Sequence, residues 1–198
     1  MDECGQGAVR VQEVMMSKVY IFFADGFEDI EGLTVVDLMR RAQIDICTVS
    51  IKDTKEVQTS HGITLKTDCI FGETDFSDAD MLVLPGGMPG TRYLGEFKPL
   101  TDLLAKFYQE GGKVAAICAA PSVFADLGFL KGRTATSYPS FMEKLHGAVT
   151  TEDAVAVDGN VTTSRGLGTA VDFSLSLISQ LAGADKAQEI AESIVYFR

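Results

Sequence analysis

The sequence predicts an α/β fold in which a mostly parallel sheet lies between two layers of helices. The first observation is a series of short, nearly continuous apolar runs, which are typical of strands covered on both faces. The second is that segments with helical periodicity alternate with these runs, as happens when helices connect parallel strands. The 198 residues contain neither a linker-like segment nor an internal repeat. We therefore expect one domain, spanning residues 16–198.

The elements are expected in a regular order along the chain. Apolar runs rich in β-forming residues predict buried strands at 18–24, 45–50, 81–84 and 113–117. Helical patterns predict helices at 31–42, 100–109 and 170–181, one opening near Pro121 and a last one from about Lys186. Turn dipeptides predict hairpins around His61-Gly62 and Asp158-Gly159. In the first helix, the side chains expected to face the core are Leu33, Val36, Leu38 and Met39.

The charge of the chain limits its partners. Lysine and arginine number 17 against 28 aspartate and glutamate residues, a net charge of −11. This charge repels nucleic acid backbones and acidic membranes, and no apolar run is long enough to cross a bilayer. A small-molecule or protein partner is expected instead. The first fifteen residues lack the apolar segment of a secretory signal, so we expect a disordered leader or a start-site artefact.

The cysteines predict neither a metal site nor a disulfide framework. The four of them, Cys4, Cys47, Cys69 and Cys118, are far apart and form no C-x-x-C pair. Their spacing favours a reducing compartment, and the cytoplasm is the expected location.

Three loops that follow predicted strands carry residues suited to chemistry. An acidic run with Glu28, Asp29 and Glu31 follows the first strand, PGGMPG follows the strand at 81–84, and Cys118 follows the strand at 113–117. Ligands of an open parallel sheet bind at the carboxyl ends of its strands, so these loops are expected to converge. Taken singly, the acidic run is more often a helix cap and a Pro-Gly-Gly a plain turn.

Cys118 is the candidate nucleophile. A cysteine that leaves a buried strand into small residues and a helix has the geometry of a nucleophile elbow. The helix N-terminus is expected to lower the thiol pKa and favour the thiolate, although a buried cysteine is more often an inert core residue. His61 lies on a hairpin turn and His146 before a helix-stopping glycine, so neither is an evident base. An acid must serve instead.

These motifs resemble the ThiJ/PfpI family, in particular its Parkinsonism-associated deglycase branch and the bacterial relatives of that branch. The segments that carry the resemblance are ADGFEDIE, VVDLMRRA, VLPGG, AAICAAP and TSRGLGT. The resemblance implies a flavodoxin-like three-layer sandwich, similar to that of class I glutamine amidotransferases. It also implies a homodimer, the usual assembly in the family. It implies that Cys118 is the reactive cysteine, that protonated Glu31 hydrogen-bonds to it, and that backbone amides face it, those of Gly86, Gly87 and Ala119.

Three positions depart from the family pattern. Peptidase-like members carry a histidine where this chain has Ala119, so proteolysis is disfavoured. Deglycase-branch members often carry a histidine where this chain has Tyr138, which leaves Glu31 as the candidate for proton transfer. Close relatives carry an arginine that reaches the partner subunit where this chain has His61. We assign Arg41, His61 and Tyr138 to a substrate or anion pocket.

The resulting functional hypothesis is a cofactor-independent enzyme of the glyoxalase III (D-lactate dehydratase) or protein deglycase kind. Cys118 would attack methylglyoxal-like dicarbonyls to form a hemithioacetal, and Glu31 would move a proton through an enediol, giving a 2-hydroxy acid. No metal or organic cofactor is required. The alternative is an oxidative-stress sensor or redox-regulated chaperone in which Cys118 oxidises before Cys47 and before Cys69, which is expected to be an ordinary thiol.

Overall fold

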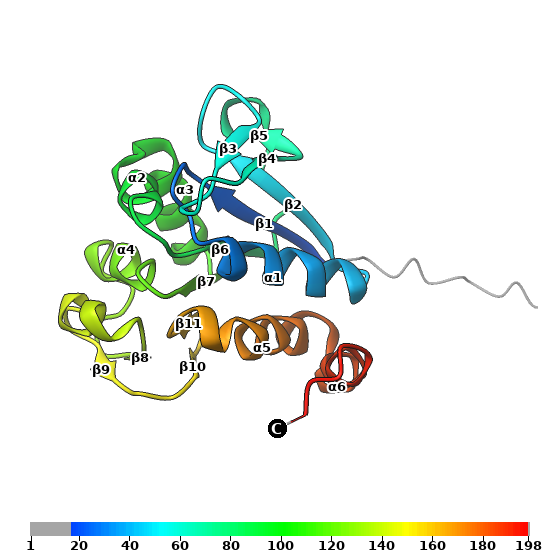
Figure 1. Cartoon of the computed structure of the whole chain (residues 1–198). Helices are drawn as coiled ribbons and strands as arrows, with labels where there is room; N and C mark the ends of the chain where they lie inside the picture. The colour runs from blue at the N-terminus through cyan, green and yellow to red at the C-terminus, as the bar shows by residue number, and fades with distance from the viewer. Residues whose placement is uncertain (1–16, 198) are drawn as a thin grey trace, which may run out of the picture.

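The structure of the chain is a computed structural model that describes residues 17–197. The predictions about residues 1–15 lie outside this range. One seven-stranded sheet, in the order β10-β11-β7-β6-β1-β2-β5, runs through the described residues (Figure 1). Its strands are β1 (Lys18–Phe23), β2 (Asp45–Ser50), β5 (Cys69–Ile70), β6 (Met81–Leu84), β7 (Lys113–Ile117), β10 (Val155–Asp158) and β11 (Val161–Ser164).

Neighbouring strands of this sheet are parallel except β10 and β11, which form an antiparallel hairpin. Two small two-stranded sheets lie outside it. They are formed by β3 (Glu56–Gln58) with β4 (Thr64–Lys66), and by β8 (Thr134–Ala135) with β9 (Val149–Thr150). Because β1, β6, β7 and β11 run parallel in the large sheet, their carboxyl ends meet at one of its edges.

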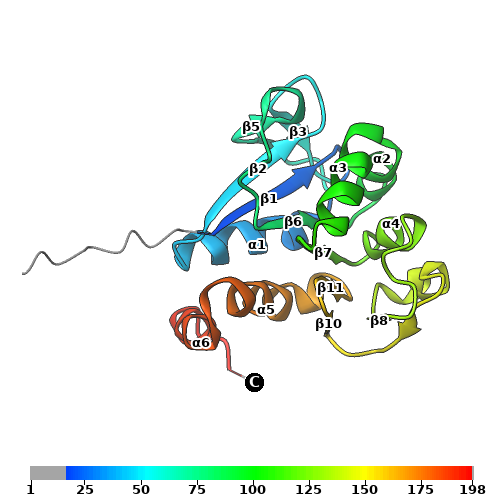
Figure 2. The ribbon, with the colours of Figure 1, turned by 180° about the vertical axis from the view of Figure 1, so that it is seen from behind.

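Helices cover both faces of the sheet, as the two opposite views show (Figures 1 and 2). On one face lie α1 (Asp29–Arg41), α5 (Ala170–Ala182) and α6 (Ala184–Ser193). On the other lie α2 (Gly90–Glu96), α3 (Lys98–Gln109) and α4 (Pro121–Asp126). Short 3₁₀ turns complete the chain at η1 (Phe71–Glu73), η2 (Pro139–Lys144) and η3 (Leu167–Thr169). The predicted flavodoxin-like three-layer fold is confirmed.

The sequence of β1 shows how one strand supplies both halves of the core. Val19, Ile21 and Phe23 pack with the helices on one side, whereas Tyr20 and Phe22 pack with those on the other. Successive side chains of a strand point to opposite faces, so a strand covered on both sides must be apolar throughout. All five side chains are at most 4% exposed.

The predicted strands at 45–50, 81–84 and 113–117 have the bounds that the structure shows. Helix α1 begins at Asp29, two residues before the predicted start. The expectation that Leu33 faces the core is wrong, because its side chain is 40% exposed and Val35 takes the buried position. Within residues 17–197, no helix combines the length and apolarity that crossing a bilayer requires.

Candidate active site

The candidate active site lies at the sheet edge where β1, β6, β7 and β11 end. The loops and helix starts after these strands carry Glu31, Gly86, Cys118 and Gly166, respectively. A Cβ atom on Gly86 would overlap Oε2 of Glu31 and would lie 2.5 Å from Cβ of Cys118. Only a residue without a side chain fits between the carboxyl and the cysteine. Three segments far apart in the sequence are thus brought into direct contact.

Cys118 occupies a strained turn between β7 and α4. Its φ angle is +64°, in the left-handed region that residues other than glycine rarely adopt and that costs about 1–3 kcal/mol. Two backbone hydrogen bonds hold it there: Cys118 N donates to Ser164 O at 3.0 Å, and Tyr138 N donates to Cys118 O at 2.9 Å. The predicted strand-to-helix elbow is confirmed.

Glu31 is a buried carboxyl group beside this thiol. It is 1% exposed, and burial raises its pKa to about 7. The Cys118 thiol lowers this pKa, the charge of Glu28 raises it, and the main-chain amides of Gly86 and Leu167 lower it. Within residues 17–197, Oε2 of Glu31 has no hydrogen-bond partner. Near neutral pH, Glu31 is therefore present in both protonation states and can accept or donate a proton.

The acidity of Cys118 differs from the sequence-based expectation. Burial, followed by the negative charge of Glu31, raises the thiol pKa to about 12 instead of lowering it. Helix α4 has only six residues, so its N-terminus offers little to oppose these effects. Each anion disfavours the other, so the pair keeps one shared proton at pH values above about 7 and below about 12. When Glu31 holds that proton, it carries no negative charge. Of the two main effects that raise the thiol pKa, only burial then remains.

Backbone amides face both reactive groups. The amides of Gly87 and Ala119 lower the pKa of Cys118, whereas that of Gly86 acts on Glu31. Gly87 has a φ angle of +90°, and a Cβ atom there would lie 2.7 Å from the carbonyl carbon of Phe27. Glycine is therefore required for the close approach of this loop. Donors placed this way can stabilise an oxyanion that forms next to the sulfur.

Gly166 and Leu167, which follow β11, complete the site and were missed by the sequence reasoning. A Cβ atom on Gly166 would lie 3.3 Å from the Tyr138 ring, 3.6 Å from Oε1 of Glu31 and 3.9 Å from Sγ of Cys118. The missing side chain leaves a space about the size of a methyl group in contact with all three groups. The available signal is a glycine two residues after the end of a strand at the same sheet edge. Tyr138, 49% exposed, borders this space.

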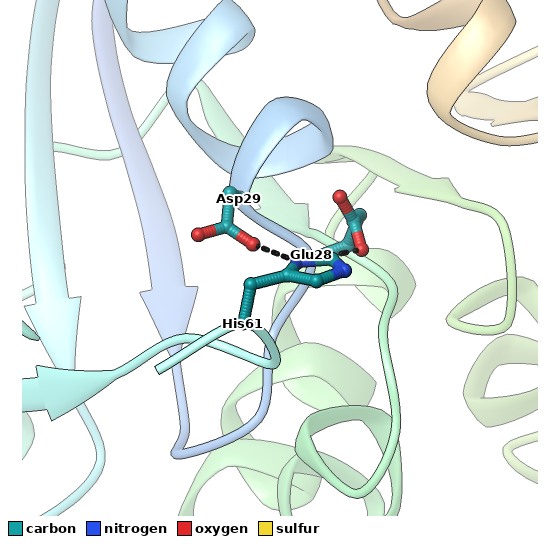
Figure 3. Close-up of side chains that lie close together, drawn as sticks. All are labelled: Glu28, Asp29 and His61. Carbon is teal, nitrogen blue, oxygen red and sulfur yellow. Dashed lines mark hydrogen bonds and ion pairs between the residues drawn. The ribbon is translucent and has the colours of Figure 1, made fainter. Parts of the chain in front are cut away.

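His61 lies on the β3–β4 hairpin and points to the start of α1, where Figure 3 shows it between two carboxylates. Its Nδ1 atom is 2.5 Å from Oδ2 of Asp29 and 3.8 Å from Oε2 of Glu28. The hydrogen bond with Asp29 raises the pKa of His61, and the charge of Glu28 adds to this effect. In its protonated form, His61 neutralises part of the acidic run next to Glu31.

The side chains of Glu28, Asp29 and His61 also offer atoms that could bind a metal ion, and these atoms lie within 4.8 Å of one another. A metal ion needs a neutral imidazole, whereas the carboxylates favour the protonated form of His61. Ion pairing accounts for this arrangement, and no metal is inferred.

Arg41 does not join the site within one chain. It is the last residue of α1, ten positions beyond Glu31 and about 15 Å farther along the helix axis. Its Nε atom is 2.9 Å from Oδ2 of Asp37, and its side chain is 51% exposed. The assignment of Arg41 to the pocket of the same chain is therefore wrong, since the helix directs its two ends to opposite edges of the sheet.

The described residues therefore form a doubly wound α/β sandwich with a strained elbow cysteine and a buried carboxyl beside it. The chain belongs to the DJ-1/PfpI family, whose family model matches residues 17–180. It is similar to Protein DJ-1 homolog B of Arabidopsis thaliana, with 39% identity over 180 residues, 90% of this chain but 41% of that protein. The chain thus spans less than half the length of this relative.

Two further relatives are matched over a larger share of their own length. Deglycase TK1284 of Thermococcus kodakarensis is 35% identical over 151 residues, which are 75% of this chain and 89% of that protein. The crystal structure of Drosophila melanogaster DJ-1beta has a TM-score of 0.89 at 35% identity and covers 93% of this chain and 100% of that one.

Proposed function

We propose that this protein is a cofactor-independent enzyme that converts methylglyoxal-like 2-oxoaldehydes to 2-hydroxy acids, with removal of early glycation adducts as a related activity. The observation that carries the proposal is the contact of a nucleophilic thiol with a buried carboxyl whose pKa is about 7, beside the space that Gly166 leaves open. Similarity to a protein named as a deglycase supports the related removal of glycation adducts.

In the first step of the proposed reaction, the Cys118 sulfur attacks the aldehyde carbon and forms a carbon–sulfur bond. Glu31 accepts the thiol proton and passes it to the aldehyde oxygen, giving a hemithioacetal. The amides of Gly87 and Ala119 donate hydrogen bonds to this oxygen while it is negatively charged.

In the second step, the Glu31 carboxylate removes the hydrogen of the carbon attached to sulfur, and an enediol forms. Protonated Glu31 returns the proton to the neighbouring carbon, and the hydroxyl proton on the carbon attached to sulfur moves to the neighbouring oxygen. The product is a thioester of the 2-hydroxy acid. Water then cleaves the carbon–sulfur bond and restores the thiol. The net reaction adds one water to the substrate and consumes no oxidant, reductant or cofactor.

The test is to incubate the purified protein with methylglyoxal and measure lactate across pH. Below pH about 7 the pair holds two protons and Glu31 cannot act as a base, so kcat/KM should be low. It should rise as pH increases through about 7 and then level off. Lactate formation that is absent, or present with no rise in this range, contradicts the assignment of Glu31.

A second candidate function is peroxide sensing at the same cysteine. The amides of Gly87 and Ala119 that face Cys118 would also donate hydrogen bonds to a sulfinate. The two functions are distinguished by the lactate assay, because a sensor needs the reactive sulfur but no turnover.

We also propose that the protein is a homodimer joined through α1 and the β3–β4 hairpin. Three large apolar side chains on these elements are exposed: Ile30 (48%), Leu33 (40%) and Ile63 (55%). Exposed apolar clusters mark interaction surfaces, and a two-fold dimer is the commonest assembly. Light scattering at micromolar concentration should give twice the chain mass of 21.3 kDa, and Leu33→Lys should shift it toward the monomer. A monomer mass for the unmodified protein contradicts this arrangement.

A further inference from the structure

A pair of thiols lies away from the candidate active site, between two neighbouring strands. Cys47 is on β2 and Cys69 is the first residue of β5, which pairs with β2 in parallel. Their Sγ atoms are 3.0 Å apart. Both sulfurs also lie near the carbonyl oxygen of Thr48, at 3.8 and 3.7 Å, so the two side chains turn to the same side of the backbone. A disulfide bond of about 2.05 Å would require the sulfurs to approach by about 1 Å.

The surroundings make the two thiols unequal. The hydrogen bond from Cys47, helped by Thr74 and Lys55, lowers the pKa of Cys69 to about 6 against the opposing effects of burial and Asp68. The same hydrogen bond and burial raise the pKa of Cys47. The expectation that Cys69 is an ordinary thiol is wrong, because its partner lies on another strand. Cys69 is thus the sulfur of the pair that loses its proton more readily.

Small oxidants can reach this pair. Both cysteines are only partly buried. Cys47 also lines an open surface hollow together with Lys18 of β1, Arg40 of α1 and Asp68.

We propose that Cys47 and Cys69 are a redox-active dithiol that hydroperoxides convert to an intramolecular disulfide, independently of Cys118. The Cys69 thiolate attacks one oxygen of hydrogen peroxide, the O–O bond breaks, and a sulfenic acid and a hydroxide ion form. The hydroxide takes a proton from the solvent and becomes water. The Cys47 sulfur then attacks the Cys69 sulfur, the S–O bond breaks, and the departing hydroxide takes the Cys47 proton as water. The two sulfurs lose two electrons in total, and hydrogen peroxide is reduced to two waters; an organic hydroperoxide would give an alcohol and one water.

The disulfide would close the segment from 47 to 69. This segment contains the β3–β4 hairpin, whose His61 contacts Asp29 beside the candidate active site. The bond therefore restrains both ends of the hairpin. This site does not depend on the proposed enzymatic function, because it shares no residue with it.

The experiment is a peptide map of the full chain after treatment with a small excess of hydrogen peroxide, alkylation of free thiols and trypsin digestion without reduction. Cleavage at lysine and arginine places Cys47 in peptide 42–52 and Cys69 in peptide 67–92. We expect these peptides to be joined, with a mass two hydrogens below their sum, and to separate on reduction. The joined peptide should form equally in Cys118→Ala.

Matched variants distinguish the roles of the two sulfurs. Cys47→Ser should remove the joined peptide and leave Cys69 with added oxygens, whereas Cys69→Ser should leave Cys47 reduced. The proposal is overturned if the wild-type peptides stay separate, if Cys69 joins Cys4, or if non-reducing electrophoresis shows a bond between two chains. The wild-type map decides the question even where a variant does not fold.

Discussion

Replacing Cys118 with serine should reduce conversion of methylglyoxal by on the order of 10³-fold or more. The side chain keeps its position and nearly its size, so the elbow between β7 and α4 should persist. The hydroxyl is a much weaker nucleophile, and Glu31, with a pKa of about 7, is too weak a base to ionise it. Lactate formation at saturating methylglyoxal, followed for both proteins at pH about 8, measures the loss.

The matched control is Cys47→Ser, which makes the same chemical change on β2 away from the site. It should keep the wild-type rate. Circular dichroism and thermal unfolding of both variants separate lost chemistry from lost folding. Wild-type turnover in a folded Cys118→Ser protein would remove the nucleophile assignment and leave Cys118 as a packing residue.

The parts of the fold that the sequence predicts well are those that local pattern determines. β6 and β7 are short apolar runs bounded by glycine, proline or charge, so their ends are visible without tertiary information. The position of Cys118 follows from the same reasoning, because a residue directly after a buried parallel strand must lie at the edge where ligands bind.

What the sequence could not supply depends on contacts between distant segments. The helix N-terminus near Cys118 is a local feature and predicts an acidic thiol, but burial in the folded chain and the charge of Glu31, from α1, raise the thiol pKa instead. Cys69 shows the opposite error, since its low pKa comes mainly from Cys47 on the neighbouring strand. Leu33 follows helical periodicity, yet α1 is rotated so that its side chain is exposed. The prediction that Arg41 lies in the pocket fails because Arg41 and Glu31 lie near opposite ends of α1.

Replacing Glu31 with glutamine should lower activity and raise stability at the same time. The amide still fills the space beside Cys118 but transfers no proton, so the rate should fall on the order of 10²-fold or more. Burial raises the pKa of Glu31 from 4.5 in the unfolded chain to about 7 in the folded one. The ionised carboxylate is therefore disfavoured by folding, and a neutral amide avoids this cost.

The pH dependence of that gain follows from the direction of the shift. Because the folded pKa is the higher one, the unmodified protein loses no stability at this group below pH about 4.5 and loses it progressively as pH rises through about 7. The free energy of unfolding of Glu31→Gln should exceed that of the wild type by about 3 kcal/mol at pH 8, and by less than about 1 kcal/mol at pH 5. Urea unfolding of both proteins at the two pH values gives this difference.

Glu143→Gln, on an exposed position of η2, makes the same chemical change outside the site and should alter neither activity nor stability. A gain for Glu31→Gln that is equal at both pH values would mean that the amide improves packing, and that Glu31 is ionised in the folded protein at little cost. A loss of stability at pH 8 would mean that the carboxylate makes favourable contacts that a neutral amide cannot. If the gain in unfolding free energy grows with pH and turnover is lost, then Glu31 and Cys118 share the proton of this site. No other combination of results supports this conclusion.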